Sequence, residues 1–443
     1  MSDKPICLVT APVATRSGYG AHSRDICRAL IKLDRYDVRI WSVRWGSTPM
    51  NALHIDDPND KMIIDRLLSE PNVERQPEIH IHIVIPTEFQ PVGKYNIGIT
   101  AGLETNICKP EWLQGMNRMN MNIVPSKFVH YTLSELAFNI QDDKTQQVTG
   151  QLKNDKPLEV LFEGADTNIY KKTNEFSKSL VDEMDKVDEK FNFLYVGHWL
   201  QGNLGEDRKD TGMLVKVFLE TFKNMKIKPG LIMKTSGAGY SVLDREAMLD
   251  KIRNIKDSID GDLPNVYLFH GDFMDEEINE LYNHPKVKAH VSLTHGEGFG
   301  RPLLEASLSE KPVMAPDWSG HIDFLSKSNA ILLGGVLEDV SKNSFPADFY
   351  QEGMKWFTVN YQEASVKMKD LFKNYRKYSL NAKKLTMFNK SKFSLNAMTV
   401  ELGKLLDKYI PEFPKEVKLE LPKLNKVNET EAPKIKLPKL KKV

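Results

Sequence analysis

The stretch THGEGFGRPLLE, residues 294–305, decides the fold. An apolar run that ends near Leu293 precedes it, as expected of a buried strand, and three glycines follow within seven residues. Pro302 suits the first turn of a helix, where its missing amide hydrogen costs nothing. A strand, a glycine loop and a helix in this order are typical of a parallel α/β sheet, which binds ligands at the carboxyl ends of its strands.

Two carboxylates within this stretch indicate a binding site rather than a plain turn. Gly298 and Gly300, on either side of Phe299, allow a ligand to approach the backbone closely, and the start of the helix favours phosphate. Glu297 stands on the loop, and Glu305 stands one turn inside the expected helix. Both carboxylates can accept hydrogen bonds from sugar hydroxyls, so we expect a sugar-containing ligand.

Strand-like and helical segments alternate on both sides of this stretch. Ile6–Thr10 is a short apolar run, and the turn Ser17–Gly20 leads from it into a helical pattern. A second series of strands and helices starts at Phe191 and runs past the 294–305 stretch. The sequence therefore predicts an α/β protein with two Rossmann-like domains that face each other across a cleft.

Composition places the expected boundaries of these domains. Residues rich in Lys, Asp, Glu, Ser and Asn separate the two series, and lysines and prolines dominate the C-terminus. The predicted parts are, in order, a first domain (1–175), a linker (176–190), a second domain (191–390), a helix that crosses back to the first domain (391–410) and a tail (411–443).

Three basic residues are the candidate cationic partners of the glutamate loop. Arg208 and Lys209 lie in a polar loop that follows the strand-like segment ending at Gly197, and Lys234 ends another apolar strand. Arg208 and Lys209 alone would more often be surface residues. Two cationic sites at strand ends, however, suit a diphosphate, whose charge must be neutralised as it leaves.

The overall composition excludes several classes of protein. The chain has 443 residues with 61 basic and 60 acidic side chains, so its body is no general binder of polyanions. Only Cys7, Cys27 and Cys108 occur, with no C-x-x-C pair, which argues against a disulfide framework or a structural zinc site. No apolar run is long enough to span a bilayer. We therefore expect a cytoplasmic protein without a transmembrane segment, although peripheral contact with a membrane stays open.

Two patterns resemble metal sites but have simpler interpretations. Asp260-Gly261-Asp262 has the D-x-D form, yet it precedes a Leu-Pro pair and is expected to be a solvated turn. His80 and His82 lie on one face of a predicted strand, without an evident cluster of further ligands. We expect no metal and no cofactor.

The C-terminal tail, residues 411–443, has its own character. It holds nine lysines, five glutamates and five prolines, and the heptamers at 418–424 and 434–440 nearly repeat each other. The simplest expectation is a disordered, solubilising segment. A docking peptide and a nucleic-acid-binding arm are the alternatives.

The 297–305 element resembles the E-x7-E element of retaining, nucleotide-sugar-dependent glycosyltransferases with the GT-B fold, and most of all their large family 4. The resemblance covers most of residues 5–410. The turn with Gly18, Tyr19 and Gly20 resembles the glycine loop of that family, and Arg208, Lys209 and Lys234 match its diphosphate-binding positions. The helix after Phe393-Ser394 resembles its closing segment. Many members place a histidine where this chain has Glu104.

The resemblance implies roles for these residues. Glu297, Arg208, Lys209 and Lys234 would be catalytic, with Glu297 facing the donor sugar and the cations stabilising the departing diphosphate. Glu305 would hold the ribose. The donor would also face the backbone amides of Gly298, Phe299 and Gly300. The residues Gly18, Tyr19, Gly20 and Glu104 would line the acceptor side.

The substrates that the resemblance implies are a nucleoside diphosphate sugar and a glycan or lipid-linked glycan acceptor. Transfer to hydroxymethylated viral DNA is the alternative acceptor reaction, prompted by the lysine-rich tail. A non-catalytic protein that binds sugar nucleotides is the alternative from another class. A glycogen- or sucrose-type phosphorylase would share the fold, but the chain shows no pyridoxal-lysine signature and is short for one.

Overall fold

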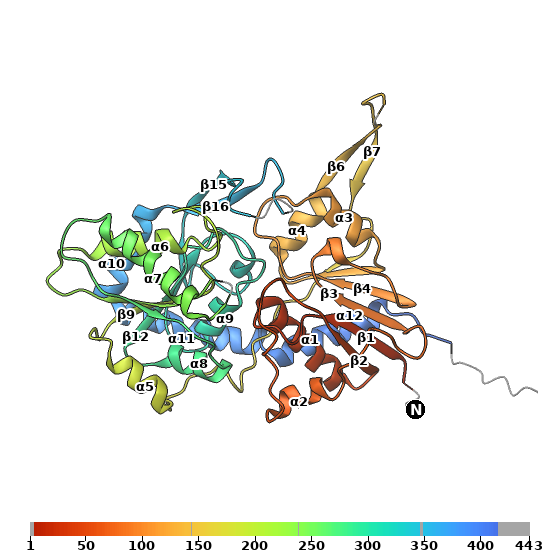
Figure 1. Cartoon of the computed structure of the whole chain (residues 1–443), viewed down its shortest axis with the longest axis horizontal. Helices are drawn as coiled ribbons and strands as arrows, with labels where there is room; N and C mark the ends of the chain where they lie inside the picture. The colour runs from red at the N-terminus through yellow and green to blue at the C-terminus, as the bar shows by residue number, and fades with distance from the viewer. Residues whose placement is uncertain (1–3, 143, 238, 346–348, 415–443) are drawn as a thin grey trace, which may run out of the picture. The chain divides into compact units, whose positions relative to one another are not determined.

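The computed structural model describes residues 4–142, 144–237, 239–345 and 349–414 (Figure 1). Two six-stranded sheets, each entirely parallel within its named pairs, form the two predicted Rossmann-like domains. The strands read as apolar runs because helices cover both faces of a parallel sheet, and β3 and β10 are buried at every position. The predicted fold class is therefore confirmed.

The first sheet has the strand order β2-β1-β3-β4-β5-β8. Its strands are β1 (Ile6–Ala11), β2 (Asp37–Ser42), β3 (Ile79–Ile83), β4 (Tyr95–Ile99), β5 (Met121–Val124) and β8 (Leu158–Val160). The helical segments of this half are α1 (Gly18–Leu33), α2 (Pro58–Ile64), the 3-10 turn η1 (Pro86–Glu88), α3 (Pro110–Asn117) and α4 (Lys127–Glu135).

The second sheet has the strand order β11-β10-β9-β12-β13-β14. Its strands are β9 (Asn192–Val196), β10 (Gly230–Lys234), β11 (Val266–Phe269), β12 (Val287–Val291), β13 (Val313–Pro316) and β14 (Ile331–Leu333). The strand order reverses between β9 and β12, and ligands of such sheets bind at the carboxyl ends of strands at this reversal.

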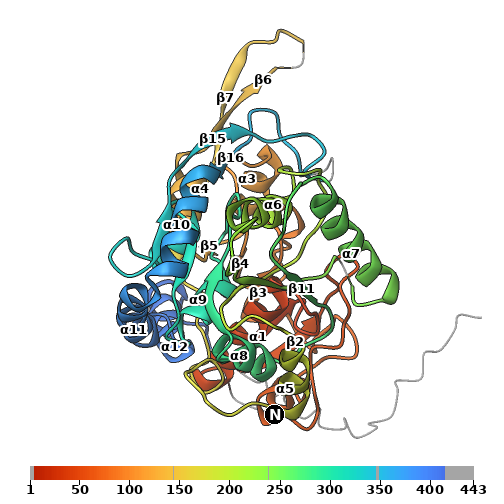
Figure 2. The ribbon, with the colours of Figure 1, turned by 90° about the vertical axis from the view of Figure 1, so that its left-hand side faces the viewer.

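The helices of the second half cover both faces of its sheet (Figure 2). They are α5 (Lys178–Asp185), α6 (Thr211–Phe222), α7 (Val242–Asp257), α8 (Asp275–Asn283), α9 (Arg301–Ser307), the 3-10 turn η2 (Gly320–Asp323), α10 (Tyr361–Lys373) and α11 (Tyr375–Lys392), and the chain ends its described helices with α12 (Leu395–Tyr409). Helix α5 lies inside the segment expected as a linker, where Leu180 and Met184 are buried.

The last helix returns to the first domain, as the sequence predicts. Helix α12 packs along α1. Lys32 of α1 donates to Asn396 over 2.6 Å, and Arg35 pairs with Asp407 over 2.5 Å. Residues 415–443, most of the predicted tail, lie outside the described residues.

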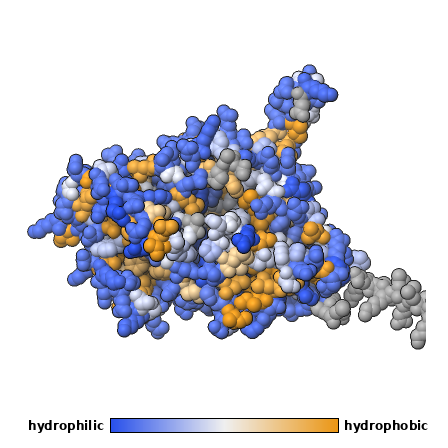
Figure 3. Space-filling model, in the orientation of Figure 1, coloured by the Kyte–Doolittle hydropathy of each residue, from blue (hydrophilic) through white to orange (hydrophobic). Residues whose placement is uncertain are grey.

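Two antiparallel pairs extend the domains. The hairpin β6 (Ala137–Gln141) and β7 (Val148–Lys153) stands out from the first domain, and Figure 3 shows its hydrophilic tip above a more hydrophobic base. The pair β15 (Gly335–Asp339) and β16 (Lys355–Val359) belongs to the second half. The largest described core cluster lies under β9 and β10 and includes the fully buried Phe193, Phe218 and Phe222.

Candidate functional site

The glycine loop of residues 294–300 connects β12 to α9, as the sequence predicts, and the structure shows why its glycines are needed. Gly300 has φ +95°, a conformation that side chains oppose, directly before the helix with Pro302 in its first turn. A Cβ on Gly298 would lie 2.1 Å from the carbonyl oxygen of Ala101, and one on Gly296 would lie 2.4 Å from that of Glu104. The glycines therefore bring this loop into backbone contact with the first domain.

Buried contacts from both domains hold the loop in place. His295 is 1 % exposed, stacks on Trp356 and contacts the carbonyl oxygen of Phe357 over 2.9 Å. The hydroxyl of Ser126, from the first domain, donates to the Gly298 carbonyl oxygen over 2.6 Å. These ties orient Glu297 between the two domains.

Glu297 and Lys209 form an ion pair at the reversal of strand order. Lys209 lies in the loop between β9 and α6, and its ammonium donates to both carboxylate oxygens of Glu297. Their side chains are 14 % and 11 % exposed. Burial opposes ionisation of Glu297, but Lys209 and Arg208 outweigh it and lower the pKa of this carboxyl. Burial lowers the pKa of the Lys209 ammonium, and Glu297 opposes this shift. Each partner thus favours the charge of the other against the cost of burial.

Arg208 reaches across to the first domain. Its guanidinium donates to Glu104 over 2.7 Å, and the two side chains are 22 % and 24 % exposed. Burial opposes the charge of Arg208, but Glu104 and Glu297 raise the pKa of the guanidinium above its usual value. The structure thus brings together four residues that the sequence singles out: Glu104, Arg208, Lys209 and Glu297.

Lys234 ends β10, as predicted, and the residue is 8 % exposed. It donates to the carbonyl oxygen of Gly271 over 2.9 Å and lies 4.7 Å from the centre of the Phe273 ring. Burial lowers the pKa of Lys234 to about 8, with Asp272 opposing and Arg16 adding to the shift. Lys234 is thus a desolvated cation at a strand end.

Arg16 is a residue that the sequence analysis misses. It precedes the N-cap of α1 in the first domain, yet its Nε lies 3.2 Å from Asp272 of the second domain, and its Nη2 lies 3.0 Å from His54. Because it also contributes to the pKa of Lys234, the two cations face one region from opposite domains. Its position next to Ser17–Gly20 was the only signal in the sequence.

The N-terminal turn has a structural role that explains its residues. Ser17 caps α1 by accepting from the Gly20 amide over 3.0 Å, and a Cβ on Gly20 would lie 2.2 Å from the Thr15 carbonyl oxygen. Gly18 is open, with nothing within 4 Å of a Cβ. Tyr19 stacks on the Trp45 ring at 3.9 Å and shares a hydrogen bond of 2.8 Å with the Thr100 hydroxyl.

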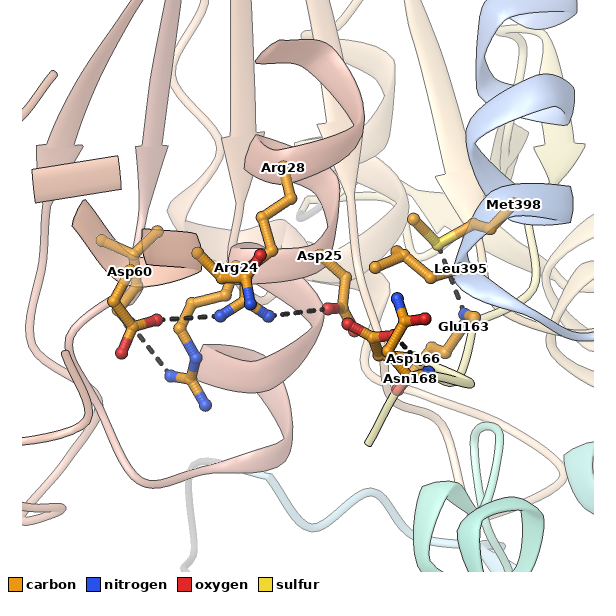
Figure 4. A network of polar contacts seen from close by, with 12 residues as sticks. Arg24, Asp25, Arg28, Asp60, Glu163, Asp166, Asn168, Leu395 and Met398 are labelled. Atoms are coloured by element: carbon orange, nitrogen blue, oxygen red, sulfur yellow. Dashed lines mark hydrogen bonds and ion pairs between the residues drawn. The ribbon is translucent and has the colours of Figure 1, made fainter. Parts of the chain in front are cut away.

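Glu305 lies in a second buried cluster, organised by Arg301. The guanidinium of Arg301 donates to Glu305 over 2.8 Å and, across the domains, to Asp25 of α1 over 2.5 Å. Glu163 lies 3.9 Å from the same guanidinium. Burial raises the pKa of Glu305 to about 7 and that of Glu163 to about 8. Figure 4 shows how Arg28 continues the network from Asp25 to Asp60.

Phe299 serves the core rather than the loop surface. Its ring is 2 % exposed and packs against Phe324 and Phe393, the latter from the segment that leads into α12. Its backbone still belongs to the loop, between Gly298 and Gly300.

The two weak metal patterns have local partners. His82 accepts from the Gln90 amide over 3.1 Å, and His80 contacts the Thr10 hydroxyl over 3.0 Å. Asp262 pairs with Lys228, and Gly261 has φ +120°, as a turn requires. Across residues 4–414, apart from the masked positions, no three His, Cys, Asp or Glu side chains are grouped to hold a metal ion. Among the same residues, no helix is long and apolar enough to cross a membrane.

The described architecture has counterparts among solved structures. No family model matches the sequence, and no curated protein matches it closely enough to count as a relative. A glycosyltransferase from Rickettsia africae is 13% identical, with a TM-score of 0.60, over 93% of this chain and 100% of that one.

Two further structures are similar over nearly the whole chain. HepE from Anabaena, in complex with UDP and glucose, is 12% identical with a TM-score of 0.58, over 91% of this chain and 100% of that one. Sucrose-phosphate synthase from Thermosynechococcus elongatus is 12% identical with a TM-score of 0.60, over 91% and 98%. At such identities the likeness is one of fold, and the chain has the GT-B fold of two Rossmann-like domains.

Proposed function

We propose that this protein is a retaining glycosyltransferase that moves a sugar from a nucleoside diphosphate sugar to an acceptor hydroxyl. One observation carries the proposal. Arg208, Lys209 and Glu297 meet at the carboxyl ends of β9 and β12, where the strand order of the second sheet reverses. A carboxylate beside two partly buried cations suits a ligand that joins a sugar to a diphosphate.

The cations bind the diphosphate by exchanging partners. Arg208 and Lys209 are held by Glu104 and Glu297, so an incoming diphosphate replaces carboxylate oxygens with phosphate oxygens at little electrostatic cost. Lys234 contributes a third positive charge, and Arg16 a fourth from the first domain. These charges stabilise the departing diphosphate, the largest electrostatic demand of the reaction.

The remaining donor contacts come from the loop and α9. The amides of Gly298, Phe299 and Gly300 line the donor side, and Glu297, released from Lys209, accepts hydroxyls of the sugar. Glu305 accepts the ribose hydroxyls with the carboxylate oxygen that Arg301 leaves available. The complex of HepE with UDP and glucose makes uridine diphosphate sugars the first donors to test.

The chemical step requires no protein base in this proposal. The bond between the anomeric carbon and the diphosphate oxygen breaks, and the acceptor oxygen bonds to that carbon on the same face. The proton of the acceptor hydroxyl passes to an oxygen of the departing diphosphate. Gly18, Tyr19, Gly20 and Glu104 line the acceptor side, where the open Gly18 leaves room for a ligand.

The first experiment screens uridine, guanosine, adenosine and thymidine diphosphate sugars for thermal stabilisation and slow hydrolysis. We expect one class to raise the melting temperature and to release its sugar. Lys209→Ala should slow that release by roughly 10²–10³-fold, as loss of one preorganised charge does. Lys186→Ala, which breaks an exposed Lys–Glu pair, is the matched control and should not change it. Failure of every nucleotide sugar to bind contradicts the proposal.

A second experiment tests whether turnover requires a metal ion. Because lysine and arginine neutralise the diphosphate, turnover should continue in the presence of a chelator. Strict dependence on manganese, restored by adding the ion back, would contradict this part of the proposal.

The acceptor is proposed to be a glycan or a lipid-linked glycan. Transfer of radiolabelled sugar to such acceptors is to be compared with transfer to hydroxymethylated duplex DNA. Transfer to the duplex alone, weakened by removal of residues 411–443, would replace the glycan with DNA as the acceptor.

A further inference from the structure

Helix α11 carries an unbalanced positive charge. The helix itself contains six basic residues and no acidic one, and Lys373 at the end of α10 adds a seventh positive charge. The rest of the chain carries more acidic than basic residues, so this helix differs in charge from the molecule around it. Figure 2 shows α11 at the edge of the view, outside α9.

The same helix exposes three large apolar side chains. Leu380, Met387 and Phe388 are 59%, 75% and 45% exposed. Their spacing places them on one helical face, together with Lys377 and Lys384. The opposite face is buried, where Asn389 donates to the Ser307 hydroxyl of α9. The outer face therefore combines cations with exposed apolar side chains.

A pocket of about 320 Å³ adjoins this face and shares Lys377 with it. Lys327 and Lys367 also line the pocket, with Tyr378 and Asn381 of α11. Lys327 pairs with Asp317, which does not line the pocket, and Asp370 of α10 accepts hydrogen bonds from Asn374 and Tyr378. The pocket thus presents cations and neutral hydrogen-bonding groups, which suit a phosphate group.

We propose that the outer face of α11 and the adjoining lysine pocket bind the surface of a membrane that contains anionic phospholipids. The lysines pair with lipid phosphates, one of which enters the pocket, and Leu380, Met387 and Phe388 insert among the acyl chains. A nucleic acid would use the cations but would leave the apolar side chains in water, so the combination favours a lipid surface. This inference does not depend on the proposed transferase activity.

The test is co-sedimentation of the full chain with vesicles of phosphatidylcholine alone or mixed with phosphatidylglycerol. We expect binding to the mixed vesicles only. Lys367→Ala/Lys377→Ala should weaken binding by roughly fivefold for each charge removed. Leu380→Ser/Met387→Ser/Phe388→Ser should weaken it by about tenfold or more, through lost apolar burial.

Matched controls come from α7, which contacts α6 and β11 at the other edge of the second sheet. Val242→Ser/Leu243→Ser removes two side chains that are 74% and 83% exposed, and Arg245→Ala/Arg253→Ala removes two exposed charges. Neither control should change binding to the mixed vesicles. Thermal unfolding of each variant confirms that it is folded.

Insertion has a direct readout, since Cys7, Cys27 and Cys108 are all buried and will not compete for a thiol-reactive dye. An environment-sensitive dye on Met387→Cys should shift its emission to the blue with mixed vesicles. The same dye on Leu243→Cys should not shift.

Three results would overturn the proposal. The first is no binding of the intact chain to the mixed vesicles. The second is binding that survives both sets of α11 substitutions but is lost when residues 411–443 are removed, which would assign it to the tail. The third is a blue shift of neither dye together with binding of a DNA duplex that the α11 substitutions abolish, which would assign the face to nucleic acid.

Discussion

Two of the ion pairs that join the domains, Arg208–Glu104 and Arg301–Asp25, differ in their surroundings. Arg208 and Glu104 are 22% and 24% exposed, and each makes a single strong contact with the other. Arg301 and Asp25 are 14% and 1% exposed, and the same guanidinium also contacts Glu305 and lies near Glu163. The first pair is partly exposed to solvent and joined by a single contact, whereas the second is buried and its guanidinium is shared among several carboxylates.

The difference separates two tasks. A partly exposed pair contributes little to stability and can exchange its carboxylate for another anion. A buried cation surrounded by carboxylates is costly to disturb, because removing it leaves charges without compensation. We therefore assign ligand exchange to the Arg208–Glu104 pair and attachment of the domains to the Arg301 cluster.

The largest effect on stability is expected for Arg301→Ala. It leaves Asp25, Glu305 and Glu163 buried together, so the free energy of unfolding should fall by about 3–5 kcal/mol. Denaturant unfolding measures this loss. Arg208→Ala is the matched control and should cost much less, and equal losses in the two variants would contradict the assignment.

A second prediction uses Lys234, which no ion pair joins to a carboxylate in the described part of the chain. Because burial lowers its pKa to about 8, its ammonium loses its charge as the pH rises above that value. Donor turnover should therefore fall by up to about tenfold per pH unit above pH 8. Lys234→Arg, whose guanidinium stays charged, should move the decline to higher pH. An identical profile for both proteins would show that Lys234 does not set it.

A third prediction concerns Glu163 and tests the burial of the Arg301 cluster. Burial raises the pKa of this carboxyl from its usual 4.5 to about 8, so the folded state holds a proton that the unfolded state releases between these values. The free energy of unfolding should therefore decrease as the pH rises from about 4.5 to 8. Glu163→Gln should flatten this part of the profile, as followed by melting temperature at several pH values. A profile as steep as that of the unchanged protein would refute the shift.

The smallest effect is expected for Glu104→Gln. Loss of this partly exposed charge should change the free energy of unfolding by about 0–1 kcal/mol. It should nevertheless alter acceptor transfer, because Glu104 lies at the site and holds Arg208. A variant with full transfer activity and clear destabilisation would reverse the roles given to the two pairs.

Much of the fold follows from local pattern, since parallel strands are buried on both faces and read as apolar runs. The glycine loop and Lys234 could be predicted for the same reason, because strand ends in such sheets face the ligand. Arg16, Asp25 and Glu163 could not. Their partners are distant in the sequence, and a single charged residue on a helix or loop carries no local sign of the side chain that it meets.

Helix α5 shows the same limit in another form. Its segment is polar enough to be interpreted as a linker, and Leu180 and Met184 are the buried side chains of the helix. Two buried side chains in eight residues are a weak periodic signal. Packing against the second domain, which the sequence does not display, provides the rest of the stability.

The backbone contact between Gly298 and Ala101 also acts as a mechanical stop. With no side chain at residue 298, main-chain atoms of the two domains meet directly at this point. A methyl group at residue 298 would push the two domains apart, because its carbon would need the space that the Ala101 carbonyl oxygen occupies. Substitutions of increasing size at residue 298 would therefore increase the separation of the two domains in steps, without changing any charge.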